Sequence, residues 1–171
     1  DFGRTTGESF LDLLKALEQV DGIERYRISS IEPNLITEEI VDWIASGTKF
    51  QPHFHIPLQT GSDELLGIDY IRSRMDHPGQ ELVFFGIDVI VGLPGETEEL
   101  FRRTYDFLRD RIRPAFIHIF PYSRRPGTRA AAMKDQVQDS IKTLRVKELE
   151  ELCRQLHEEF VSRHKGMKGR V

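Results

Sequence analysis

The sequence has a single cysteine, Cys153, among its 171 residues. One thiol excludes an internal disulfide, and it excludes an iron–sulfur or zinc site built from this chain's cysteines alone, because such sites need three or four thiolates. Long hydrophobic runs are also missing, since no stretch approaches the roughly 18 apolar residues of a membrane span. The first 20 residues do not read as a signal peptide. These absences predict a cytoplasmic protein with no membrane partner.

What is present is typical of a globular domain, with 39% hydrophobic, 9% aromatic and 30% charged residues. The length suits one domain or a piece of a larger protein, and is short for a complete eight-stranded α/β barrel of about 250 residues. Charge is uneven, because residues 1–66 carry 5 basic and 12 acidic side chains, whereas residues 102–129 carry 8 arginines and 2 aspartates. This asymmetry indicates a polyanion-facing second half, and scattered surface charge is the alternative.

Hydrophobic periodicity predicts helices that alternate with short strands. A helical stripe from Phe10 ends at Gly22, a second helix is capped by Thr37, a weaker one covers part of 64–76, and Thr97 caps a helix over 98–109. Strands are predicted over 26–31, 53–58, 83–91 and 116–120. Such alternation indicates βαβ units and a parallel sheet.

The last predicted element is a long amphipathic helix over 137–164. Its predicted buried face carries six apolar residues, and Cys153 is expected to be a buried packing residue on the same helix. The six are Ile141, Leu144, Leu149, Leu152, Leu156 and Phe160.

Polar groups gather where the predicted strands end, which is where parallel α/β proteins bind ligands. Glu32 offers a carboxylate to a ligand ammonium group, and Gln59 with Ser62 offers amide and hydroxyl groups suited to a ribose or a carboxylate. Gly92 and Gly95 permit close approach of the backbone to a flat ring. A purely structural role is the alternative to ligand binding for three of these residues. Glu32 and Ser62 could begin helices, and Gly95 could form part of a turn.

The histidines predict no metal site. His53 and His55 are expected to face opposite sides of the sheet, and His118 is expected to be a packed strand residue. No His, Cys, Asp or Glu cluster has metal-ligand spacing, and no catalytic residue is assigned. Arg124 and Arg125, in a strand-end loop, are candidates for phosphate contacts, with solvated surface arginines as the alternative.

Taken in order, four segments resemble the radical S-adenosylmethionine methylthiotransferases. They are residues 27–33 (RISSIEP), 53–63 (HFHIPLQTGSD), 88–97 (DVIVGLPGET) and 122–128 (YSRRPGT). The SSIEP form is most similar to the branch that acts on N6-threonylcarbamoyladenosine beside the tRNA anticodon. Two alternatives stay open: a non-catalytic RNA-binding α/β module, and another radical S-adenosylmethionine enzyme that modifies a protein or a small molecule.

The resemblance implies an α/β fold, namely a partial TIM-like radical barrel with parallel strands and a C-terminal amphipathic helix. Residues 1–133 would form the later strands, and residues 134–171 a helical extension leading to an RNA-binding domain. The cysteine loops for two 4Fe–4S clusters would lie outside this chain, so the chain is expected to be an inactive fragment of a transferase. Only 24 residues separate Asp63 from Asp88, which is fewer than is usual in the family. Either this loop is shorter, or residues are missing between Leu66 and Gly67, and the second explanation is favoured.

By motif position, the resemblance also implies the ligands. tRNA phosphates would contact Arg124 and Arg125, and a flavodoxin or ferredoxin would supply electrons. The cofactor S-adenosylmethionine would contact eight residues: Ser30, Glu32, Gln59, Ser62, Ile90, Gly92, Phe120 and Tyr122.

Overall fold

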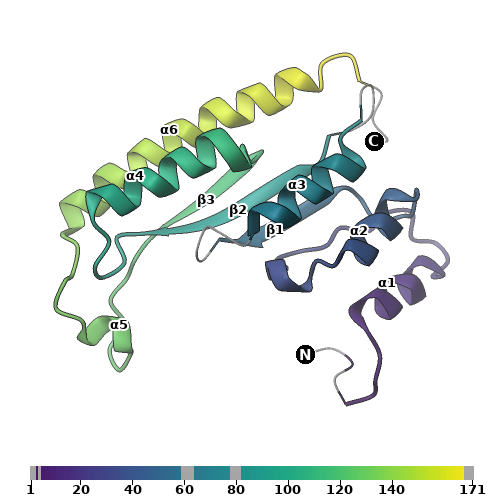
Figure 1. Ribbon diagram of the computed structural model, residues 1–171, viewed down its shortest axis with the longest axis horizontal. Helices are drawn as coiled ribbons and strands as arrows, with labels where there is room; N and C mark the ends of the chain where they lie inside the picture. Colours follow the sequence, from purple (N-terminus) through teal and green to yellow (C-terminus); the bar gives the residue numbers. More distant parts are fainter. Residues whose placement is uncertain (1–2, 4, 59–63, 78–81, 168–171) are drawn as a thin grey trace.

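A computed structural model describes residues 3, 5–58, 64–77 and 82–167 (Figure 1). Gln59 and Ser62 lie outside the described residues. Three parallel strands form the sheet: β1 (His53–Pro57), β2 (Phe84–Val91) and β3 (Phe116–Pro121), ordered in space as they are in sequence. The predicted parallel α/β architecture is therefore confirmed, with three strands in the part of the chain that is described.

The helices begin and end close to the predicted positions. They are α1 (Phe10–Glu18), η1 (Pro33–Leu35), α2 (Glu38–Ala45), α3 (Glu64–Met75), α4 (Glu98–Phe107), η2 (Leu108–Ile112), α5 (Arg129–Ala132) and α6 (Asp139–Arg163). Thr37 and Thr97 cap α2 and α4 as predicted, because their hydroxyls accept from the backbone N–H of Ile40 and Leu100. The short helix α5 was not predicted.

The predicted strand over 26–31 is wrong in part. This segment runs beside β1 but makes only two parallel bridges, Tyr26 with Phe50 and Ser30 with His55. From the first bridge to the second, the chain advances four residues on the 26–31 side and five residues on the β1 side. One extra residue on the β1 side therefore interrupts the pairing. Pro52 lies in the longer stretch and has no N–H to donate, which adds to the interruption.

Among the described residues, helices cover one face of the sheet, whereas the other face meets a helix at Phe84, which packs against Phe160 of α6. Figure 1 shows α6 along the sheet, where it lies beside β3. Alternate strand side chains that point toward the helices are buried; they include Phe54, Ile56, Phe85, Ile87, Val89 and Ile117. The opposite face is named here the open face, and it carries His55, Gly86, Asp88, Ile90, Phe116, His118 and Phe120.

The buried face of α6 differs from the prediction in its first two turns. Leu149, Leu152 and Leu156 are buried as predicted, but Ile141 and Leu144 are exposed. Lys142 and Arg145 are buried in their place. The reason is that both cations reach polar groups at the strand ends, described below. In the described part of the chain, no helix combines the length and the apolar character needed to cross a bilayer.

Candidate ligand site at the strand ends

The loop after β2 is held by its own glutamate and by α6. Gly92 is buried with φ of +76°, and its N–H donates to the carboxylate of Glu96. A Cβ at Gly92 would lie 2.4 Å from Cγ of Lys142. The aliphatic part of the Lys142 side chain therefore fills the space next to Gly92 that a larger residue would need.

Lys142 links the ends of two strands. Its ammonium donates to the carbonyl of Tyr122 at 3.2 Å and to Asp139 at 3.1 Å, and lies 5.5 Å from the centroid of the Tyr122 ring. The N–H of Tyr122 donates to the carbonyl of Val91 at 2.8 Å. The hydroxyl of Tyr122 is buried and has no hydrogen-bond partner within the described residues. Tyr122 is therefore fixed by its backbone and ring, with an unused polar group.

Arg145 fixes the same loop from the next turn of α6. Its guanidinium donates to the Glu96 carboxylate at 3.0 Å and to the Glu96 carbonyl at 3.3 Å, and it lies 5.1 Å from the Phe101 ring centroid. Sequence reasoning missed both buried cations. A signal was available, since Lys142 and Arg145 precede Leu149 at helical spacing on one face.

Ile90 and Phe120 form an apolar platform at the carboxyl end of the open face. They are register partners on β2 and β3, and each is about half exposed, at 49% and 50%. Two adjacent apolar side chains left in solvent are suited to a flat ring. These two predicted cofactor residues are thus brought together.

Ser30 and Glu32 lie at the other edge of the sheet, beyond β1. Both line a groove of about 800 Å³ between the 26–35 segment and α1. Glu32 is exposed and is the residue before η1, where its side chain makes no cap hydrogen bond. The structure therefore separates this pair from the Ile90–Phe120 platform, because β1 lies between the 26–31 segment and β2.

The arginines of the basic segment divide into two groups. Exposed helix arginines are ion-paired: Arg102 with Glu98 at 2.8 Å, and Arg103 with Glu99 at 2.7 Å. Arg124 instead donates to the carbonyl of Ala131 at 2.9 Å, and the Arg125 side chain is exposed. Neither has an acidic partner among the described residues.

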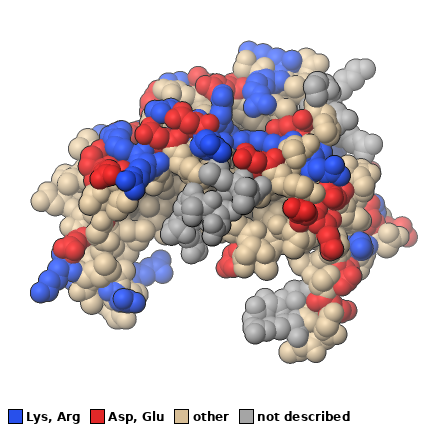
Figure 2. Space-filling model, in the orientation of Figure 1, with Lys and Arg blue, Asp and Glu red and all other residues tan. Residues whose placement is uncertain are grey.

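Figure 2 shows this division on the surface. Blue and red atoms alternate over the helices, whereas blue atoms gather around the loop that leads into α5. Arg124 and Arg129 line a hollow of about 650 Å³ in that loop. The two predicted phosphate ligands thus belong to the part of the basic segment that is not neutralised locally.

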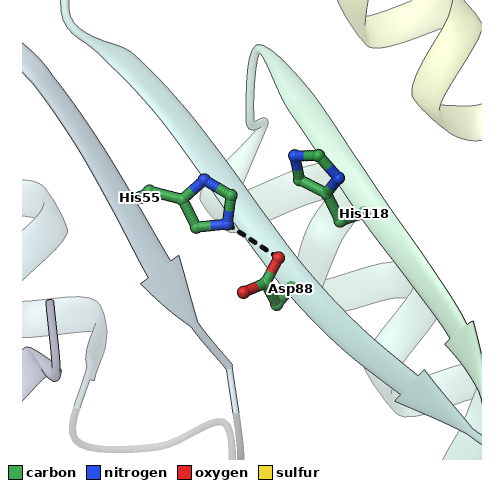
Figure 3. Close-up of side chains that lie close together, drawn as sticks. All are labelled: His55, Asp88 and His118. Atoms are coloured by element: carbon green, nitrogen blue, oxygen red, sulfur yellow. Dashed lines mark hydrogen bonds and ion pairs between the residues drawn. The ribbon is translucent and has the colours of Figure 1, made fainter. Parts of the chain in front are cut away.

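Three side chains on the open face form a cluster that sequence reasoning missed (Figure 3). Nε2 of His55 lies 2.7 Å from Oδ1 of Asp88, and the rings of His55 and His118 are 4.9 Å apart. The prediction that His53 and His55 face opposite sides is wrong. Residues two apart in a strand share a face, and His53 stacks on Phe84 at 4.4 Å on that same side. That periodicity was the missed signal.

Cys153 does not offer a cluster ligand. Its thiol lies between α6 and β3, where it accepts from the N–H of Ile117 at 3.2 Å, and burial raises its pKa. The prediction of a buried packing cysteine is confirmed. A 4Fe–4S cluster therefore does not fit the residues described, because their one thiol is buried in the packing between α6 and β3.

The fold and these residues define an α/β protein that places polar and apolar binding groups at the carboxyl ends of parallel strands. No protein-family model matches the chain. It is 39% identical to the threonylcarbamoyladenosine tRNA methylthiotransferase MtaB of Bacillus subtilis, over 92% of this chain and 37% of the relative. The Aquifex aeolicus protein of that name is 38% identical over 99% of this chain and 43% of the relative. A third relative, the tRNA-2-methylthio-N(6)-dimethylallyladenosine synthase of Carboxydothermus hydrogenoformans, is 36% identical over 84% and 34%.

Over the segment that it comprises, the chain belongs to the tRNA methylthiotransferase family. It spans about two fifths of the length of the relatives from Bacillus and Aquifex. The match to the Aquifex protein runs over 179 residues, whereas this chain has 171, so at least 8 aligned positions (179 − 171) have no counterpart here.

Proposed function

We propose that this chain is part of an enzyme that adds a methylthio group to N6-threonylcarbamoyladenosine in tRNA. The observation that carries the proposal is the similarity over nearly the whole chain to proteins named for this reaction, at 39% and 38% identity over 92% and 99% of the chain. Relatives named for dimethylallyladenosine are 33–38% identical over 78–96% of the chain. The SSIEP motif supports the same choice of base.

The proposal includes S-adenosylmethionine as the cofactor. When bound beside a reduced iron–sulfur cluster, this cofactor supplies radical chemistry. In this chain, the half-exposed pair Ile90 and Phe120 would pack against its adenine, and Tyr122 would offer its unused hydroxyl. Ser30 and Glu32 would bind polar groups from the opposite edge of the sheet, together with Gln59 and Ser62. Gly92 would act indirectly, through the loop geometry that it allows.

The wider architecture is part of the proposal. The open face would line a partial TIM-like barrel formed by residues 1–133, and residues 134–171 would lead to an RNA-binding domain. A flavodoxin or ferredoxin would reduce the clusters, and the cytoplasm would be the compartment. Support comes from the strand order, which follows the sequence as in a barrel wound in one direction.

Arg124 and Arg125 are proposed to contact tRNA phosphates. The double variant Arg124→Ala/Arg125→Ala should weaken tRNA binding by the full chain and lower the slope of log K against log salt by about 1.5–2, for two lost phosphate contacts. Filter binding at several salt concentrations measures both quantities. The matched control is Arg102→Ala/Arg103→Ala, which removes two arginines that acids already neutralise. An equal loss in the control would contradict the assignment.

The choice of substrate is tested in cells. Deletion of the encoding gene in its source organism, followed by mass analysis of tRNA nucleosides, should remove 2-methylthio-N6-threonylcarbamoyladenosine and leave the unthiolated nucleoside. Loss of the dimethylallyladenosine derivative instead would overturn the choice of base. An unchanged nucleoside profile would overturn the proposed function itself.

A further inference from the structure

We propose that His55, Asp88 and His118 form a binding site for a divalent transition-metal ion with the preferences of Zn²⁺. The site lies on the open face and uses none of the residues assigned above to tRNA or to S-adenosylmethionine. It rests on the geometry of three strands and does not depend on the proposed function.

Each strand contributes one ligand at a similar height in the sheet. Asp88 on β2 is the register partner of His118 on β3, and His55 on β1 lies next to Ser30 and Gly86 in the adjacent row. One ligand atom from each residue, a ring nitrogen or a carboxylate oxygen, lies within 4.8 Å of the other two. Figure 3 shows the two rings and the carboxylate converging over β2. Three donor groups from three elements thus face one small volume.

Gly86 makes this convergence possible. A Cβ at this position would lie 3.2 Å from Nδ1 of His55, which is tighter than ordinary van der Waals contact. Because Gly86 has no side chain, the His55 ring can lie across β2 and bring Nε2 within 2.7 Å of Asp88. A larger residue would move the ring away from the carboxylate.

The donor set suits zinc chemistry. Two imidazole nitrogens and one carboxylate oxygen are the protein ligands of many zinc sites that keep a fourth position open. Bonds of about 2.0–2.1 Å in a tetrahedron require ligand atoms about 3.3 Å apart. His55 and Asp88 would separate slightly to reach that spacing, and the exposed His118 would turn toward them. The fourth position would face the open side of the sheet.

A metal-free explanation of the cluster is a hydrogen bond between His55 and Asp88 alone. In that case the bond is complete without His118, whose ring is held by aromatic contacts with Phe116 at 4.7 Å and Phe120 at 6.5 Å. His118 therefore separates the two explanations. Its replacement removes a metal ligand but leaves the His55–Asp88 hydrogen bond in place.

The test is metal titration of the full 171-residue chain after treatment with a chelator and its removal. Calorimetry with Zn²⁺ should give one ion per chain, and Co²⁺ should give the visible absorption of a tetrahedral site. His118→Ala and Asp88→Asn should each weaken binding at least tenfold, as should Gly86→Ala by moving His55. The control His77→Ala removes an exposed histidine from outside the cluster and should bind as the original chain does.

Circular dichroism and the urea midpoint of each variant separate a lost ligand from a lost fold. His118→Gln keeps most of the side chain's size and should show the same loss as His118→Ala. The proposal is overturned if the chain takes up no Zn²⁺, if both His118 variants bind as tightly as the original, or if His77→Ala loses as much affinity.

Discussion

Gly92 and Gly95 have nearly the same φ angle and very different surroundings. Their φ angles are +76° and +84°, in the left-handed region that favours glycine. A Cβ at Gly92 would meet Lys142 at 2.4 Å, whereas a Cβ at Gly95 would meet nothing within 4 Å. Substitution of each glycine by alanine therefore distinguishes the loss of stability caused by backbone strain, at Gly95, from the additional loss caused by overpacking, at Gly92.

We expect Gly95→Ala to lower the free energy of unfolding by about 1 kcal/mol through the backbone alone. Gly92→Ala should lower it by a further 1–3 kcal/mol, roughly the cost of overpacking a filled site. Urea unfolding of both variants measures the difference. Equal losses would show that Lys142 moves away at no cost.

His53 gives the chain a predictable response to acid. Burial is the main cause that lowers its pKa to about 4 from an ordinary 6.5, and the charges of Arg27 and His55 add to it. The unfolded chain therefore binds more protons than the folded chain between these two values. Stability is lost as the pH falls from about 6.5 toward 4.

Urea midpoints measured from pH 7.5 to 4 should show this loss, and His53→Gln should reduce it. His77→Gln, at an exposed histidine, should leave the slope unchanged. If the His53→Gln chain loses stability over this range as steeply as the original does, the acid response has another source.

For the individual residues of the site, some of the positions were predictable from the sequence. The positions of Ile90 and Phe120 follow from strand periodicity, and the same rule applied to His53 and His55 would have placed them on one face. The contact between His55 and Asp88 was not predictable. It depends on the register between strands 33 residues apart and on the space left by Gly86.

Among the elements, α6 shows how tertiary contacts override a hydrophobic pattern. Ile141 and Leu144 fit an apolar face, yet the helix is rotated so that Lys142 and Arg145 are buried. Helical spacing places Lys142 and Arg145 on the face of Leu149, but the sequence of the helix does not show what makes their burial favourable, because the partners Glu96 and Tyr122 lie far away in the chain. The segment 26–31 is a similar case, since its pairing is interrupted by an extra residue on the β1 side.

Replacement of Arg145 tests how α6 holds the loop after β2. The side chains of Arg145 and Glu96 are 5% and 14% exposed, so Arg145→Met would leave a largely buried carboxylate without its cation. We expect a loss of about 3–5 kcal/mol in the free energy of unfolding.

The matched control is Arg154→Met on the same helix. Arg154 pairs with Glu151 and Glu158 at an exposed position, and its loss should cost less than about 1 kcal/mol. The double variant Arg145→Met/Glu96→Gln should recover part of the loss, because it removes the unpaired charge. Absence of any recovery would mean that the pair is not coupled.

For the molecule as a whole, the main feature is a sheet with one covered and one open face. The order and direction of β1, β2 and β3 were predictable, because apolar runs separated by helices require parallel strands. Closure into a barrel was not, since it depends on strands beyond the three described. The open face leaves Ile90, Phe116 and Phe120 exposed to solvent.

Exposed apolar surface of this kind should bind a hydrophobic fluorescent dye at neutral pH. The variant Ile90→Ser/Phe120→Ser should reduce the dye fluorescence several-fold. Leu144→Ser/Val161→Ser, at two exposed apolar residues of α6, should reduce it little. Equal effects of the two variants would mean that the dye does not distinguish the open face.

The one-sided cover of the sheet has a consequence for how this segment changes in evolution. Along each strand, neighbouring residues face different environments, so two sets of positions are interleaved at a period of two. Substitutions in one set alter how tightly the helices are held, and substitutions in the other alter what the sheet presents to a ligand. New specificity can therefore arise at Ile90, His118 or Phe120 without rebuilding the scaffold that supports them.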